Sequence, residues 1–204
     1  MIPQEIKTGW LDTELISLTN QYNKENRKIL LNLAKESIQH GLDTGRPLAV
    51  DIKQFPPELA DRCATFVTLQ KKGQLRGCIG ILEAVRPLAQ DICENAFSAA
   101  FRDPRFPPLE ENELELLDIH LSILSSPEPM TFTSEEDLIS QIRPGVDGLI
   151  LEESSRRGTF LPSVWESLPS ARQFLRQLKK KAGLPEDFWS DTIKVSRYTT
   201  EYIE

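Results

Sequence analysis

One short stretch of the chain, residues 74–80 (QLRGCIG), sets a guanidinium and a thiol two positions apart among glycines. In an extended strand, side chains two residues apart share a face, so Arg76 and Cys78 are expected to point the same way. A thiolate is favoured beside positive charge, which makes Cys78 a candidate nucleophile, redox thiol or ligand to a partner's metal. Free cysteine is also often a small buried hydrophobe, and Gly77 and Gly80 suit close packing or a bulge. Both interpretations stay open at this stage.

A second charged segment, residues 101–109 (FRDPRFPPL), mixes arginines with prolines that restrict the backbone. Guanidinium groups bind carboxylate and phosphate in bidentate fashion, so Arg102 and Arg105 are candidates, with Arg76, for an anion or partner surface. Asp103 is expected to orient one of these arginines. The structural alternative is that the arginines satisfy carbonyls at the end of a helix. We predict that Arg76, Cys78 and Arg105 line one concave surface.

Other reactive residues are sparse. His120 is a possible base for Cys78, although a lone strand histidine is more often a hydrogen-bonded surface residue. The three cysteines are odd in number and form no C-x-x-C pair, and there are only two histidines. A disulfide framework or a tetrahedral zinc site is therefore not expected, and we predict neither a metal nor a cofactor.

Charge and composition narrow the class of protein. The net charge is −7 and the sequence pI about 5.1, so binding to nucleic acid, including by Arg172 and Arg176, is expected to be weak. With 204 residues, 39% of them apolar and without a Gly/Ser-rich linker, the chain favours one compact body. It shows neither a secretory leader nor an 18-residue apolar run, which predicts a cytoplasmic protein that does not span or bind a membrane.

The first half of the chain predicts the elements that position these residues. A helix is expected from the capping Asn23 to Gly41, with a short extended piece at residues 48–50. Residues 64–82 predict a hairpin whose second strand carries Arg76 and Cys78. Pro87 begins a helix that ends near Arg102, and residues 117–123 alternate as a strand.

The second half predicts a helix over 135–142, a hairpin within 146–161, a helix from Ser170 to Gly183 and a strand over 192–198. Helices and strands are interleaved, but hairpins require antiparallel pairing. The sequence therefore predicts an α+β fold with a mainly antiparallel sheet and flanking helices.

Four stretches together resemble a known family. They are LRGCIG at 75–80, FRDPRFPPL at 101–109, RPGVDGLI at 143–150 and FLPSVW at 160–165. They resemble the AMMECR domain family, and most nearly its bacterial and archaeal branch, AmmeMemoRadiSam system protein A. The resemblance covers residues 23–204 as an AMMECR-type domain and leaves residues 1–22 as an N-terminal extension.

The resemblance implies one compact α+β domain of two lobes and an unsettled biochemical role. It also implies association with a Memo-like protein and a radical SAM protein, together with a proposed link to nucleic acid. Family members with His at position 147 and Tyr at position 160 imply that Asp147 and Phe160 are not essential catalysts. Our leading hypothesis is an accessory protein that binds a partner or a small anionic ligand through Arg76, Gly77, Cys78, Gly80, Arg102, Asp103 and Arg105. The alternatives are an enzyme with Cys78 as its reactive residue and, more distantly, a nucleic-acid-binding protein.

Overall fold

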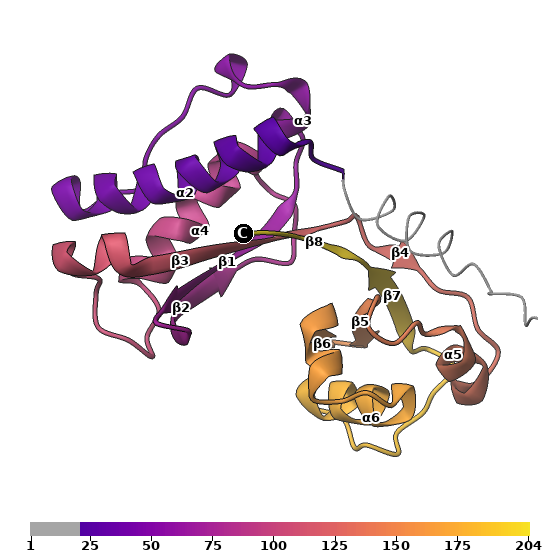
Figure 1. Ribbon diagram of the computed structural model, residues 1–204. Helices are drawn as coiled ribbons and strands as arrows, with labels where there is room; N and C mark the ends of the chain where they lie inside the picture. The colour runs from indigo at the N-terminus through magenta and orange to yellow at the C-terminus, as the bar shows by residue number, and fades with distance from the viewer. Residues whose placement is uncertain (1–20) are drawn as a thin grey trace, which may run out of the picture. The chain divides into compact units, whose positions relative to one another are not determined.

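A computed structural model describes residues 21–204, which divide into two compact units (Figure 1). Unit 1 comprises residues 21–123 and 201–204, and unit 2 comprises residues 124–200. The short helix expected within residues 1–22 lies almost wholly outside the described residues. Tyr22, at the end of that segment, is 2% exposed and belongs to the hydrophobic core of unit 1.

Unit 1 is built on a four-stranded sheet in the order β2-β1-β3-β8. Its strands are β1 (Ala64–Lys71), β2 (Gln74–Gly80), β3 (Leu117–Leu124) and β8 (Thr200–Ile203). Two long helices, α2 (Lys24–Thr44) and α4 (Leu88–Phe101), pack on one face of this sheet, as Figure 1 shows. The 3-10 helices η1 (Ile52–Gln54) and η2 (Glu111–Leu116) and the short helix α3 (Pro57–Ala60) complete the unit.

Apolar residues alternate along the strands and recur at helical spacing in α2 and α4, and together they form the hydrophobic core of unit 1. Val67 and Leu69 of β1 and Leu121 of β3 are fully buried against helix residues such as Ile92. Ala96, Ala99 and Ala100 keep the buried side of α4 narrow, which lets the helix approach the sheet closely.

Helix α2 differs from its predicted end. Asn23 caps its start as expected, with its side chain accepting a hydrogen bond from the Asn26 amide at 2.8 Å. The helix does not stop at Gly41 but runs through it to Thr44, and Gly45 takes the left-handed conformation with a φ of 71°. Gly41 instead gives the rings of Phe97 and Phe101 room to pack on α2. Gly41 therefore allows α4 to approach α2 closely and does not form a turn.

The β1–β2 hairpin is antiparallel, with a register shift between Leu69 and Gln70. Leu69 is paired with Gly77 and Gln70 with Leu75, so Arg76 is the additional residue of a β-bulge. Lys72 and Gly73 make the turn, both with positive φ. The hairpin agrees with the prediction, and the bulge lies next to Gly77, where the glycine had left close packing or a bulge as alternatives.

Unit 2 contains a second four-stranded sheet, ordered β4-β7-β5-β6, in which every adjacent pair is antiparallel. Its strands are β4 (Glu128–Pro129), β5 (Gly148–Glu153), β6 (Arg156–Phe160) and β7 (Lys194–Tyr198). Helices α5 (Glu135–Gln141) and α6 (Ala171–Lys181) and the 3-10 helix η3 (Pro162–Glu166) pack around it. The core centres on Phe174, whose ring stacks on Trp165 with centroids 3.9 Å apart.

The predicted α+β class, with antiparallel pairing and flanking helices, is confirmed. Residues 48–50, expected as a short extended piece within a loop, carry no helix or strand, and the short strands β4 and β8 were not predicted. Pairing partners for β8 lie far away in sequence, and its four residues give too short an alternation to be recognised. Across residues 21–204, no helix combines the length and the apolar character that crossing a bilayer requires.

Candidate functional site

Strand β2 lies at the edge of the unit 1 sheet, and the segment after α4 covers that edge at Cys78. The backbone N–H of Cys78 donates to the Asp103 carboxylate at 2.9 Å, and its carbonyl accepts from the Arg105 guanidinium at 3.2 Å. Two side chains therefore take the places that a neighbouring strand's backbone would fill. We call this group, Cys78 with Asp103 and Arg105, the capped edge.

Asp103 organises the capped edge. It is 4% exposed, and besides Cys78 it accepts hydrogen bonds from the backbone and the guanidinium of Arg105, the shortest at 2.6 Å. The Arg105 guanidinium, aided by the two backbone amides, holds the pKa of this carboxyl well below its usual range. Asp103 thus orients an arginine, and Arg105 and Cys78 lie in contact.

The Cys78 thiol points across to β1. Thr68 is its register partner, and the Thr68 hydroxyl donates to Sγ at 3.3 Å. Because the N–H and C=O of Cys78 face away from β1, the two residues form a non-hydrogen-bonded pair, in which side chains approach closely. The thiol is half-buried. The hydrogen bonds to Asp103 are the main cause that raises the pKa of the neighbouring Arg105.

Arg76 has a different carboxylate partner, and its guanidinium also lies 3.4 Å from the Pro108 carbonyl, in the segment that carries Arg105. Its guanidinium makes a bidentate pair with the Glu113 carboxylate, at 3.1 and 2.8 Å, and Lys71 adds a third bond to the same carboxylate. These bonds, led by those from Arg76, lower the pKa of Glu113 to about 2. The bulge at Arg76 gives this side chain its own direction. Arg76 and Arg105 are therefore each neutralised by a carboxylate of their own.

The remaining predicted residues have packing roles. A Cβ on Gly77 would overlap the Ala99 carbonyl of α4, and one on Gly80 would overlap the Phe66 ring and the Thr65 carbonyl. Arg102 ends α4, and its guanidinium lies 4.8 Å from the centre of the Phe97 ring.

His120 does not meet Cys78. It lies on β3, and β1 separates this strand from β2. Strands are spaced by about 4.8 Å, so two spacings place the backbones about 10 Å apart, beyond hydrogen-bond reach. Its Nδ1 instead lies 3.4 Å from the carboxylate of Glu204. Among the described residues, no three His, Cys, Asp or Glu side chains gather closely enough to hold a metal ion.

Comparison with known proteins gives this arrangement a family. The AMMECR1 family model matches residues 31–203, which is most of the chain. The chain belongs to the AMMECR1 family. A protein of Methanothermobacter thermautotrophicus is 40% identical over 185 residues, covering 88% of this chain and 94% of its own length. One from Thermotoga maritima is 44% identical over 152 residues, covering 73% and 82%.

A solved structure supports the fold of this AMMECR1-family protein. The crystal structure of uncharacterized protein PH0010 from Pyrococcus horikoshii superposes with a TM-score of 0.75 at 36% identity. The match covers 85% of this chain and 88% of that one. All of unit 2, and the capped edge within unit 1, lie in the span matched by the family.

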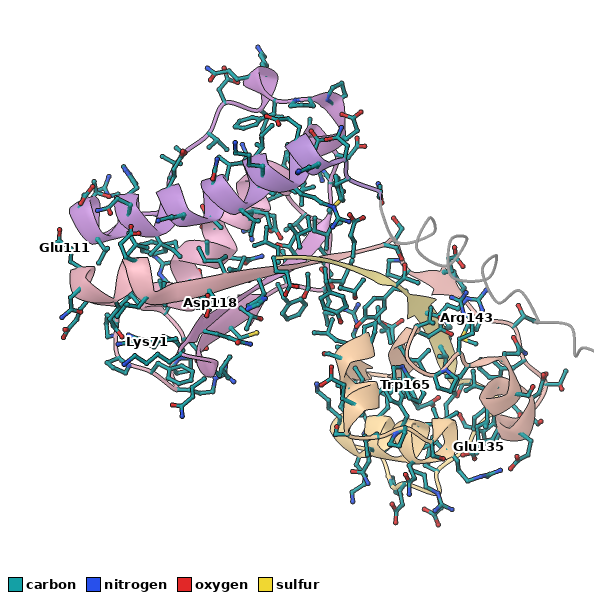
Figure 2. All side chains as sticks on the ribbon, in the orientation of Figure 1. Lys71, Glu111, Asp118, Glu135, Arg143 and Trp165 are labelled. Carbon is teal, nitrogen blue, oxygen red and sulfur yellow. The ribbon has the colours of Figure 1, made fainter. Side chains whose placement is uncertain are left out.

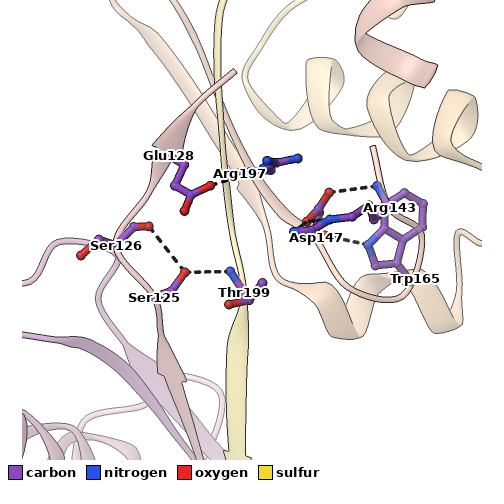
Figure 3. A network of polar contacts seen from close by, with 8 residues as sticks. All are labelled: Ser125, Ser126, Glu128, Arg143, Asp147, Trp165, Arg197 and Thr199. Atoms are coloured by element: carbon purple, nitrogen blue, oxygen red, sulfur yellow. Dashed lines mark hydrogen bonds and ion pairs between the residues drawn. The ribbon is translucent and has the colours of Figure 1, made fainter. Parts of the chain in front are cut away.

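In unit 2, residues 143–150 form an aspartate–arginine pair similar to that of the capped edge (Figure 3). Asp147 is fully buried and accepts from the backbone and the guanidinium of Arg143, while its own carbonyl accepts from the Trp165 indole at 2.7 Å. Arg143 remains half-exposed. A buried aspartate that fixes a half-exposed arginine through a tight turn thus occurs in each unit. The contacts of Asp147 hold Arg143 and Trp165 in place.

Proposed function

We propose that this AMMECR1-family protein is an accessory protein of the cytoplasm that binds a partner protein through the capped edge. The observation that carries the proposal is the state of Arg105. Three side-chain bonds fix its guanidinium, yet its side chain is 53% exposed and its other terminal nitrogen has no partner among residues 21–204.

The surroundings of Arg105 resemble the centre of a protein interface. The guanidinium lies 5.5 Å from the centre of the Phe106 ring, and exposed prolines stand on both sides, at positions 104 and 107. Arginine and aromatic residues are enriched at binding hot spots, and a rigid segment loses little entropy on binding. A free anion is a weaker candidate, because Asp103 already neutralises Arg105 and Glu113 neutralises Arg76. The family resemblance suggests a Memo-like or a radical SAM protein as the partner.

Changing Arg105 to alanine is expected to weaken binding of the Memo-like or radical SAM protein of the same organism about tenfold or more, because truncating a central arginine often costs this much. Binding of the purified proteins is measured by calorimetry. Arg172→Ala serves as the matched control, since Arg172 is also half-exposed and carboxylate-paired but lies on α6. Equal affinity of the Arg105 variant and the unaltered protein for every partner that binds contradicts the proposal.

A thiol enzyme is the second candidate, and two contacts of Cys78 favour it. The Thr68 hydroxyl donates to Sγ at 3.3 Å, and the Arg105 guanidinium donates to the Cys78 carbonyl at 3.2 Å. No histidine, lysine or carboxylate side chain hydrogen-bonds Sγ among the described residues, so a base to activate the thiol is missing. The contacts thus favour the accessory role over the enzyme.

Alkylation by iodoacetamide at neutral pH distinguishes an accessory protein from an enzyme that uses the Cys78 thiol. Cys93 is expected to stay unreacted in the folded protein, because burial raises the pKa of its thiol to about 12. The half-buried Cys78 is expected to react, at no more than about the rate of a small thiol of ordinary reactivity. Peptide mass spectrometry follows each cysteine. A rate for Cys78 on the order of a hundredfold above that of such a thiol would support the enzyme instead.

A further inference from the structure

A cavity of about 520 Å³ lies in unit 1, away from the capped edge. Its wall is formed by one side of α2, the start of β3, Gln70 of β1 and Glu204 beyond β8. Its volume falls within the range of small-molecule sites, about 300 to 1,000 Å³. Leucine and isoleucine side chains line part of it, so a ligand with a short apolar chain fits its composition.

The polar groups of the wall are mostly hydrogen-bond acceptors. Asp118, which is labelled in Figure 2, is exposed. It has no hydrogen-bond or ion-pair partner among residues 21–204. The Glu204 carboxylate is 81% exposed, and its only partner among residues 21–204 is His120. The single cation of the wall, Lys35, is already paired with Glu115 at 2.9 Å. The cavity therefore carries an excess of negative charge, in a protein whose net charge is −7.

His120 also lies in this wall. Its Nδ1 lies 3.4 Å from the Glu204 carboxylate, and its Nε2 is closed to water and has no partner among the described residues. An occupant that binds Glu204 therefore contacts the carboxylate against which the ring is placed, so the His120 ring reports on binding.

We propose that this cavity binds a small aliphatic diamine or polyamine. Two ammonium groups match the two exposed carboxylates of Asp118 and Glu204, and the methylene chain between them matches the apolar part of the wall. The carboxamides of Asn32 and Gln70 offer further acceptors for the N–H donors. An anion is disfavoured by both carboxylates, and a neutral polyol leaves their charge without a partner.

Calorimetric titration with putrescine, a four-carbon diamine, tests the site at about 0.15 M salt. We expect saturable binding with a Kd of about 1 mM or tighter. Asp118→Asn is expected to weaken it about threefold, and the double change with Glu204→Gln about tenfold, the loss typical of exposed ion pairs. Glu111→Gln removes the same charge from an exposed residue outside this cavity and is expected to leave the Kd unchanged.

Two comparisons make the test decisive. The neutral diol of the same length is expected not to bind, and putrescine is expected to shift the imidazole nitrogen NMR signals of His120. Absence of binding up to about 10 mM putrescine overturns the proposal. So does an equal loss of affinity in the Glu111 variant, equal binding of the diol, or saturable binding that leaves the His120 signals unmoved.

Discussion

Replacing Asp103 with asparagine is expected to lower the free energy of unfolding by about 2 to 3 kcal/mol. Four hydrogen bonds from Cys78 and Arg105 end on this carboxylate, and asparagine offers one oxygen acceptor and turns an N–H₂ group toward the other donors. Breaking a fully buried ion pair costs more, about 3 to 5 kcal/mol. The lower figure applies here because half of the Arg105 side chain remains in water.

Thermal unfolding measures this effect. For a chain of this size, 1 kcal/mol corresponds to about 2 to 4 °C, so the Asp103 variant should melt about 4 to 12 °C lower. Asp43→Asn is the matched control, because Asp43 lies exposed on α2 and accepts a single hydrogen bond from Gln39. The control should change the stability by less than about 0.5 kcal/mol. Equal melting temperatures for the two variants would show that the capped edge contributes nothing.

The Asp103 carboxylate also makes the difference in unfolding free energy between the unaltered protein and Asp103→Asn depend on pH. The pKa of Asp103 is lowered in the folded state, so folding favours the ionised form. The stabilisation is fully present above the unfolded pKa of about 3.9 and is lost as the pH falls through the folded value. The gap in unfolding free energy between the unaltered protein and Asp103→Asn should therefore be constant near neutral pH and narrow below about pH 4.

Local patterns explain what the sequence predicted well. The hairpin, α4 and the alternation in β3 rest on periodicity and turn residues that act within a few positions. The role of Asp103 also follows locally, since it lies two residues from the arginine that it orients. The meeting of Cys78 and Arg105 was predicted from the return of α4 across the sheet, and the contact is present.

The features of the site that the sequence did not predict depend on contacts between segments that are distant in the chain. Glu113, the partner of Arg76, lies 37 residues away in an acidic run whose only local signal is the Glu110 to Glu113 capping spacing. The bulge that turns Arg76 depends on the exact register with β1, which composition does not encode. Each of the two arginines expected to share one anion surface therefore has a carboxylate of its own.

Gly77→Ala is expected to have the largest effect of any single methyl group at the capped edge, a loss of about 3 kcal/mol or more. The new Cβ would overlap the carbonyl oxygen of Ala99, which belongs to the backbone of α4 and has no rotamer through which to move. Relief requires α4 to move away from β2. The segment that follows α4 carries Asp103 and Arg105, so the same movement strains the bonds to Cys78.

Gly73→Ala separates this overlap from the general effect of replacing glycine. Gly73 lies in the turn of the same hairpin, where a Cβ meets no atom within 4 Å but the φ is 72°. Its replacement should cost only the left-handed strain, about 1 to 2 kcal/mol. Urea unfolding compares the two variants, and partner binding should also weaken in Gly77→Ala, because the displaced helix end carries Arg105. Equal stability losses would mean that α4 yields freely, and the close packing at Gly77 would then not be what positions the capped edge.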